Sequence, residues 1–247
     1  DFTYLTPDIA YHRDKFSRSD RLINVWGADH HGYIPRMKAA MNFLGNDPDA
    51  LEVIVTQLVS LEREGVEVQM SGRLGDMVSL DEVVDEVGPD AARFTFLTQS
   101  MDTKQKIDLT ALAEKSMDNP VYYVQYATAR INQLTKNAEM AGHARVVLSD
   151  VNLSTLTNER ELEVLRVLST FSEIVAIAAR ERAPHKITTW LRELAAAFHG
   201  FYADCYVVGD GVSPELTQAR LWLIEAARIG LTSGLDLVGV SAPEEMR

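Results

Sequence analysis

The sequence predicts an α/β, Rossmann-like region with part of a parallel sheet, followed by an all-α helical bundle. In the first region, the apolar run Leu22–Gly27 leads into a helical pattern from Pro35 to Leu44, which is the strand–turn–helix order of parallel sheets. Beyond Asp108, short runs and glycines give way to long stretches with apolar residues at helical spacing. We therefore expect an α/β domain over residues 1–108 and a bundle over residues 109–247.

Two further patterns define elements of the α/β region. The stretch from Val53 to Leu61 is apolar and rich in β-branched residues, which predicts a second strand. Ser79 followed by Glu82 predicts a capping box at the start of a helix that ends near Gly88.

The bundle should begin where Asn119 caps a helix whose first residue is Pro120. Further helices are expected over residues 191–205 and from Pro214, and the polar stretch 142–157 should be an exposed connection. One more helix should bury a stripe formed by Leu162, Leu165, Leu168, Phe171 and Val175. Short connections between one-sided helices favour antiparallel packing.

The composition excludes several classes of protein. The 24 Lys and Arg against 36 Asp and Glu give a net charge of −12, which argues against a protein that coats nucleic acid by bulk charge. No apolar run approaches the roughly 18 residues of a membrane span. The single cysteine, Cys205, cannot form an internal disulfide, which suits a reducing compartment. We expect a soluble, cytoplasmic monomer that does not bind membranes.

The first candidate site follows the strand at Leu22–Gly27, because ligands of open α/β sheets bind outside the carboxyl ends of strands. Here lie Asp29, His30, His31 and Gly32, and the two imidazoles can donate to a phosphate or a ribose. Tyr4 and Asp8 form a second pair, in which a carboxylate beside a hydroxyl can bind a guanidinium or ammonium group. The structural alternatives are histidines that hydrogen-bond within the fold and an Asp8 that complements the positive end of a helix.

A third candidate is the loop 69–76, which contains Met70, Ser71, Gly72 and Arg73. Small residues and one fixed cation ahead of a capped helix can cover a triphosphate, with Arg73 stabilising charge as pyrophosphate leaves. The alternative is an ordinary surface loop.

The bundle has one basic and aromatic stretch, with Arg180, Arg182, Lys186 and Arg192 around Trp190. Rings and guanidinium planes suit an RNA loop, whose unstacked bases can stack on them. The alternative is a solvated corner between helices. We expect the rings of Tyr122, Tyr123 and Tyr126 to pack within the bundle instead of binding RNA.

The order of these motifs resembles one family. The stretches 4–11 (YLTPDIAY), 25–32 (VWGADHHG) and 70–73 (MSGR) resemble the later catalytic half of arginyl-tRNA synthetases of bacterial type. The stretch 119–131 is similar to the segment that leads into the family's helical domain, and 242–246 to its carboxyl-terminal signature. The resemblance covers essentially the whole chain.

The resemblance implies an arginine–tRNA ligase, with ATP and Mg²⁺ as substrate, arginine and tRNA(Arg) as partners, and no structural metal. By matching positions, Tyr4, Asp8 and Asp29 would bind arginine, and His30, His31 and Gly32 would bind the adenosine of ATP. Met70, Ser71 and Arg73 would contact the phosphates in catalysis. The bundle would bind the anticodon, and within it we assign Arg180, Arg182, Lys186, Trp190 and Arg192 to tRNA.

Two departures limit the resemblance. Gly72 stands where the family's loop usually has a lysine, so one cation is lost while Arg73 remains. The resemblance also begins part-way through the catalytic domain, so we expect a fragment that is inactive by itself. The alternative is a non-catalytic tRNA-binding module or a synthetase paralogue. A cysteinyl-type synthetase ranks last, because one cysteine cannot build a thiolate-rich zinc site.

Overall fold

The computed structural model describes residues 5–68 and 78–246. Contacts between Cα atoms divide the chain into two compact units. The first contains residues 1–60 and 101–106, and the second contains residues 61–100 and 107–247. The functional boundary near Asp108 stays a prediction.

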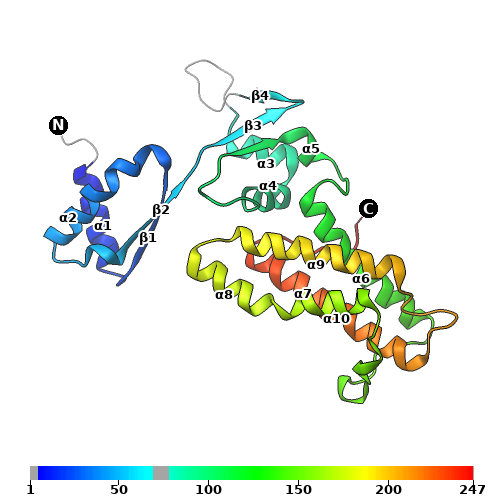
Figure 1. The fold of residues 1–247 in the computed structure, drawn as a ribbon. Helices are drawn as coiled ribbons and strands as arrows, with labels where there is room; N and C mark the ends of the chain where they lie inside the picture. The colour runs from blue at the N-terminus through cyan, green and yellow to red at the C-terminus, as the bar shows by residue number, and fades with distance from the viewer. Residues whose placement is uncertain (1–4, 69–77, 247) are drawn as a thin grey trace. The chain divides into compact units, whose positions relative to one another are not determined.

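The first unit contains a parallel strand pair with helices (Figure 1). Strands β1 and β2 run parallel, with Leu22 opposite Leu51, and α2 lies between them in the chain. The predicted strand–turn–helix order is therefore confirmed. The elements are α1 (Leu5–Phe16), β1 (Leu22–Gly27), the 3₁₀ turn η1 (Ala28–Tyr33), α2 (Ile34–Phe43), η2 (Pro48–Ala50) and β2 (Leu51–Thr56).

The core of this unit forms on one face of β1. Leu22 packs with Met37 and Met41 of α2, whereas Ile23 and Val25 on the opposite face are exposed. Asn24 is a buried polar residue on the covered face, since side chains along a strand alternate between faces. A polar side chain thus lies where an apolar one would be expected.

The strand predicted over residues 53–61 is wrong in its extent, because the structure has two strands here, β2 and β3 (Val59–Arg63). Between them the Gln57 amide donates to the carbonyl of Met101 at 2.8 Å, which takes the backbone out of the β2 pairing. Strand β3 pairs antiparallel with β4 (Val66–Val68), in a sheet of order β4-β3-β5 with β5 at Gln105–Asp108.

Short helices follow in the second unit: α3 (Leu80–Val87), α4 (Pro89–Phe96) and α5 (Leu109–Ala113). The capping box is confirmed. The Ser79 hydroxyl accepts from the Glu82 amide at 3.2 Å, and the Glu82 carboxylate accepts from the Ser79 amide at 2.6 Å.

The helical bundle makes up the rest of this unit. Asn119 caps α6 as predicted, because its side-chain oxygen accepts from the amides of Val121 and Tyr122. Helix α10 approaches α7 and α9 closely at Gly230, where a Cβ atom would come within 2.8 Å of the Leu168 side chain of α7 and 3.1 Å of the Leu194 side chain of α9. The helices are α6 (Pro120–Met140), α7 (Glu159–Ser169), α8 (Phe171–Glu181), α9 (His185–Asp204) and α10 (Pro214–Leu237).

The single helix predicted after the connection is wrong, because the structure has two helices there, α7 and α8, and the predicted stripe is also wrong at two positions. Leu162 and Leu165 of α7 are exposed, and the buried side chains are Val164, Val167 and Glu161. Glu161 is only 1 % exposed, and its carboxylate accepts from Arg220 of α10 at 2.7 Å. A buried ion pair thus sets the face that α7 turns inward, and hydropathy alone cannot reveal such a pair.

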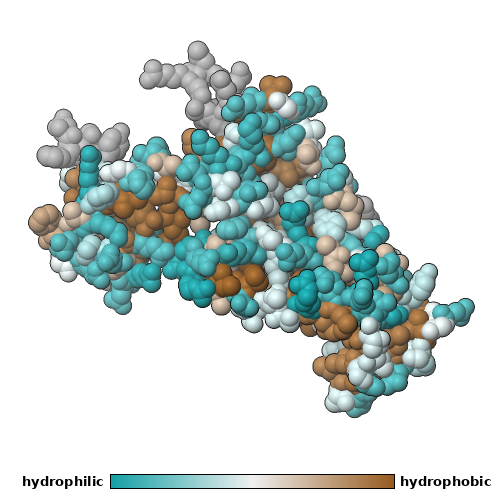
Figure 2. All heavy atoms as spheres, in the orientation of Figure 1, coloured by the Kyte–Doolittle hydropathy of each residue, from teal (hydrophilic) through white to brown (hydrophobic). Residues whose placement is uncertain are grey.

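The connection between α6 and α7 is largely exposed, as predicted, and contains the 3₁₀ turns η3 (Leu148–Asp150) and η4 (Leu153–Thr155). It carries exposed apolar side chains, including Val147 and Leu153, and Figure 2 shows apolar atoms gathered around it at lower right. Within residues 5–68 and 78–246, no helix has the length and apolarity needed to cross a membrane.

Candidate functional site

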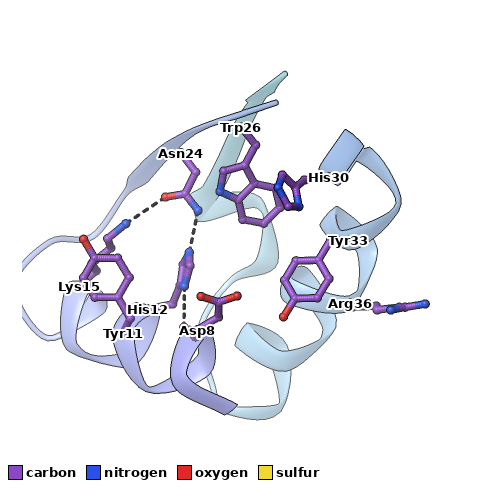
Figure 3. A pocket seen from close by; sticks show the side chains of 9 residues that line it. All are labelled: Asp8, Tyr11, His12, Lys15, Asn24, Trp26, His30, Tyr33 and Arg36. Atoms are coloured by element: carbon purple, nitrogen blue, oxygen red, sulfur yellow. Dashed lines mark hydrogen bonds between the residues drawn. The ribbon is translucent and has the colours of Figure 1, made fainter. Parts of the chain in front are cut away.

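A cavity of about 520 Å³ opens in the first unit, between α1, the end of β1 and the turn η1. Figure 3 shows its side chains: Asp8 and Tyr11 project from α1, Trp26 from β1, and His30 and Tyr33 from η1. The end of the strand therefore supplies part of the site, as expected for an open α/β sheet.

A chain of hydrogen bonds runs along one wall of this cavity. Nδ1 of His12 lies 2.7 Å from the Asp8 carbonyl, and Nε2 of His12 lies 2.6 Å from Nδ2 of Asn24. The side-chain oxygen of Asn24 accepts from Lys15 at 3.1 Å. A carbonyl can only accept, so His12 donates through Nδ1 and accepts at Nε2. The chain fixes α1 against β1 and holds the Asp8 backbone.

The Asp8 carboxylate is the negative group of the cavity. Within the part of the chain that the structure describes, it has no ion-pair partner, and the Tyr33 hydroxyl beside it is buried with no hydrogen bond of ordinary length. Burial raises the pKa of Tyr33, and the negative charge of Asp8 and the interaction of its carboxylate with the Tyr33 hydroxyl raise it further, although Arg36 acts in the opposite direction. A carboxylate that no described residue pairs with, beside a buried hydroxyl and an indole ring, suits a cationic ligand with several N–H donors.

Not every candidate of the first unit lines this cavity. Asp8 and His30 do, whereas Asp29, His31 and Gly32 are exposed on the turn η1 beside it. The Asp29 carboxylate lies 3.4 Å from Nε2 of His30. It also lies against Gly27, where a Cβ atom would come within 2.6 Å of an Asp29 oxygen, so a larger residue at position 27 would move the Asp29 side chain. Tyr4, Met70, Ser71, Gly72 and Arg73 lie outside the described residues.

The sequence did not reveal most of the other residues that line this cavity. His12, Asn24 and Lys15 were not singled out, and neither were Trp26 and Tyr33. Asn24 could have been found, because an amide at an inward position of an otherwise apolar strand needs a buried partner. His12 could not, because only the fold brings it to Asn24.

The prediction that Trp190 stacks on RNA is wrong, because its ring is buried. It is 2 % exposed, its indole donates to the Val167 carbonyl at 2.9 Å, and its ring packs on Phe171. Its position on α9 points into the bundle, so the aromatic part of the predicted basic stretch belongs to the core.

The other basic candidates lie in two places. Arg180, Arg182 and Lys186 surround the turn from α8 to α9, where Glu181 lies 3.8 Å from Arg180 and 3.3 Å from Lys186. Arg182 has φ 54° at the end of α8, and its guanidinium donates to the Ala179 carbonyl at 2.6 Å. Arg192 lies further along α9 and lines a separate cavity of about 390 Å³ with Tyr123.

A second basic and aromatic cluster lies on α6 and α9. The guanidinium of Arg130 lies 4.4 Å from the ring centroids of both Tyr126 and Tyr202, and Tyr122 stacks on Tyr126 at 5.8 Å. Among the described residues, no carboxylate pairs with Arg130. The tyrosines were expected only to pack, yet they are half-exposed. The spacing of Tyr122, Tyr126 and Arg130, four residues apart each time, was the available signal.

The described residues contain no group of three or more His, Cys, Asp or Glu side chains placed to hold a metal ion. Cys205 is buried, and burial raises the pKa of its thiol.

Comparisons with known proteins identify both parts of the chain. Residues 124–246 match the family model of the DALR anticodon binding domain. The arginine–tRNA ligase of Listeria welshimeri is 49% identical over 246 residues, which is 99% of this chain and 44% of that protein. The chain corresponds to the carboxyl-terminal portion of arginyl-tRNA synthetases. It spans less than half the length of the curated relatives that it matches.

Other arginyl-tRNA synthetases agree. The arginine–tRNA ligase of Solidesulfovibrio magneticus is 48% identical, over 100% of this chain and 45% of that protein. A solved structure from Campylobacter jejuni assigned as an arginyl-tRNA synthetase has a TM-score of 0.86 at 38% identity, over 98% of this chain and 52% of that one. The Thermus thermophilus arginyl-tRNA synthetase shares the fold, with a TM-score of 0.74 at 23% identity over 93% of this chain and 42% of that one. The predicted fold class and family resemblance are confirmed.

Proposed function

We propose that this chain is part of an arginine–tRNA ligase, and that its first unit binds the substrate arginine at the Asp8 cavity. The observation that carries this proposal is the Asp8 carboxylate, which has no ion-pair partner among the described residues, beside the buried Tyr33 hydroxyl. A guanidinium group is a planar cation with five N–H donors, so it can pair with the carboxylate and also donate to the hydroxyl oxygen. Tyr4 and Asp29 would complete the arginine site, as the family resemblance implies.

The reaction needs no enzyme nucleophile. The arginine carboxylate attacks the α-phosphate of ATP, a carboxylate–phosphorus bond forms, and pyrophosphate leaves. The terminal ribose hydroxyl of the tRNA then attacks the activated carbonyl, and AMP leaves. What the protein supplies is position and electrostatic stabilisation.

ATP would enter with Mg²⁺ as its counter-ion. We assign the adenosine to His30, His31 and Gly32, which lie together on η1. The phosphates are assigned to Met70, Ser71 and Arg73 on the family resemblance alone. Gly72 leaves Arg73 as the cation of this loop, which favours a shifted phosphate contact over an inactive enzyme.

We assign tRNA to the bundle. Two surfaces are candidates: the turn with Arg180, Arg182 and Lys186, and the face formed by Arg130 and the tyrosines, here called the α6–α9 face (Tyr122, Tyr123, Tyr126, Arg130, Arg192, Tyr202). The α6–α9 face has the stronger support, because a guanidinium that no described carboxylate pairs with, between two partly exposed rings, offers both charge and stacking planes to a single-stranded loop.

Two assays test the proposal. Residues 1–247 alone should show no ATP–pyrophosphate exchange, and exchange near the rate of a complete enzyme would contradict the fragment assignment. Calorimetry with arginine and, separately, with a tRNA(Arg) transcript distinguishes the enzyme part from the alternative, a binding module or paralogue. Binding of tRNA without arginine would favour that alternative. Monomeric state and cytoplasmic location stay predictions.

A further inference from the structure

His199 of α9 is a partly buried ionisable group behind the α6–α9 face. Its ring lies edge-on to Tyr123 at 4.8 Å between centroids, and 6.1 Å from the ring of Tyr126. Nε2 lies 3.3 Å from the Tyr123 carbonyl, and Nδ1 is buried with no hydrogen-bond partner among the described residues. The carbonyl can only accept, so the neutral ring donates from Nε2 and carries a lone pair on Nδ1.

The surroundings of His199 oppose its charged form. Burial lowers its pKa below the ordinary 6.5, the hydrogen bond to the Tyr123 carbonyl acts in the opposite direction, and the positive Arg130 lowers the pKa again. A proton added at Nδ1 would also have no acceptor. Besides Arg130, the side chains that contact the His199 ring are Tyr123 and Tyr126 of α6 and Phe198 of α9, and none of these three is a carboxylate that could stabilise a proton on the ring. On its other side, α9 meets α10 through Gly230, which lies against Leu194 and Trp190.

An anion bound at Arg130 would change this balance. Phosphate groups of RNA would offset the positive charge of Arg130, which is the charged side chain that disfavours protonation of His199. Burial would still lower the pKa of His199 in the complex, so bound RNA would reverse only the part of the lowering that Arg130 causes.

We propose that His199 is a positioning residue coupled to proton uptake. In the free protein its neutral ring supports the tyrosines that hold Arg130. When RNA phosphate binds at Arg130, the ring takes up one proton from solvent at Nδ1. This inference rests on the proposed binding of tRNA to the α6–α9 face.

The sign of the effect follows from linkage. The charged form is more favourable in the complex, so binding takes up protons and the RNA affinity rises as the pH falls through the His199 titration. Each unit by which RNA raises the pKa of His199 adds a factor of about 10 in affinity at low pH. We expect RNA to bind about threefold to tenfold more tightly at a pH below the His199 titration than at a pH above it.

The experiment is calorimetry of the full chain with a synthetic anticodon stem–loop of tRNA(Arg). Titrations in two buffers of different ionisation enthalpy, at equal pH and ionic strength, give the number of protons taken up. His199→Gln should lower that number, whereas the matched control His143→Gln, in the connection after α6, should not. An unchanged proton number in His199→Gln overturns the inference.

A second measurement needs no substitution at His199. Histidine-labelled protein followed by NMR should show the pKa of His199 rise on addition of the stem–loop, and Arg130→Gln should raise it without RNA. A His199 pKa that RNA leaves unchanged overturns the inference while tRNA binding itself stands. Undiminished RNA affinity in Arg130→Gln, or no RNA binding at all, overturns the proposed RNA face and the inference together.

Discussion

Replacing Asp8 by asparagine tests the arginine site most directly. Asn keeps the size of the side chain and removes its charge, so the guanidinium loses its charge-assisted pair but finds the same cavity. A hydrogen bond to a charged group contributes about 1.5–3 kcal/mol. Asp8 has no other ion-pair partner among the described residues, and Trp26 and Tyr33 shield the cavity, so we expect the upper half of this range. This corresponds to a rise of ~40- to 150-fold in the KM for arginine.

The assay is ATP–pyrophosphate exchange by a complete synthetase that contains this chain. Asp14→Asn is the matched control, because Asp14 lies on the same helix, is exposed and pairs with Arg18 at 3.0 Å. Its removal should change the KM by less than about twofold, since exposed pairs contribute little. Asp8 also lies in the first turn of α1, where losing a negative charge costs about 0.3–1 kcal/mol of stability. Thermal unfolding separates that cost from binding.

A second readout comes from Tyr33. Because the charge of Asp8 is one cause of the raised pKa of Tyr33, Asp8→Asn should lower that pKa toward 10.0 without reaching it, since burial remains. Spectroscopic titration of the tyrosines measures this change. An unchanged arginine KM in Asp8→Asn, or an equal rise in Asp14→Asn, would refute the reasoning.

Three further predictions concern the bundle. Arg220→Met should cost about 3–5 kcal/mol in urea denaturation, because Glu161 stays buried without its counter-charge; adding Glu161→Gln should recover part of this loss, and no recovery would count against the ion pair. Trp190→Ala should lower the free energy of unfolding by about 3–5 kcal/mol in the same measurement. A loss as small as that for an exposed residue would contradict the place of Trp190 in the core. Replacing Arg182 and Lys186 together by glutamine should lower tRNA affinity and reduce its logarithmic salt slope by about 2. An unaltered slope would assign the RNA contacts to the α6–α9 face alone.

Local signals determined the elements of this protein that depend on neighbouring residues. The Ser79–Glu82 capping box, the Asn119 cap and the strand–turn–helix order from Leu22 are properties of a few adjacent residues, and each was read correctly from the sequence. The carboxylate of the cavity was also found, because Asp8 carries its own chemistry wherever it lies. The order of the motifs was sufficient for the family.

Tertiary structure alone decided which side chains meet. The inward face of α7 depends on Arg220, which lies 59 residues from Glu161 in the chain. Likewise, the cations around Trp190 in the sequence predict an exposed ring, whereas the packing of the bundle buries it. His12 and Asn24 are 12 residues apart in the chain and form a hydrogen bond only because α1 packs on β1. Arg130 contacts the ring of Tyr202 only because α6 packs on α9. Hydropathy and residue spacing describe one helix or strand at a time, whereas the burial and the pairing of a side chain depend on the second element that packs against it.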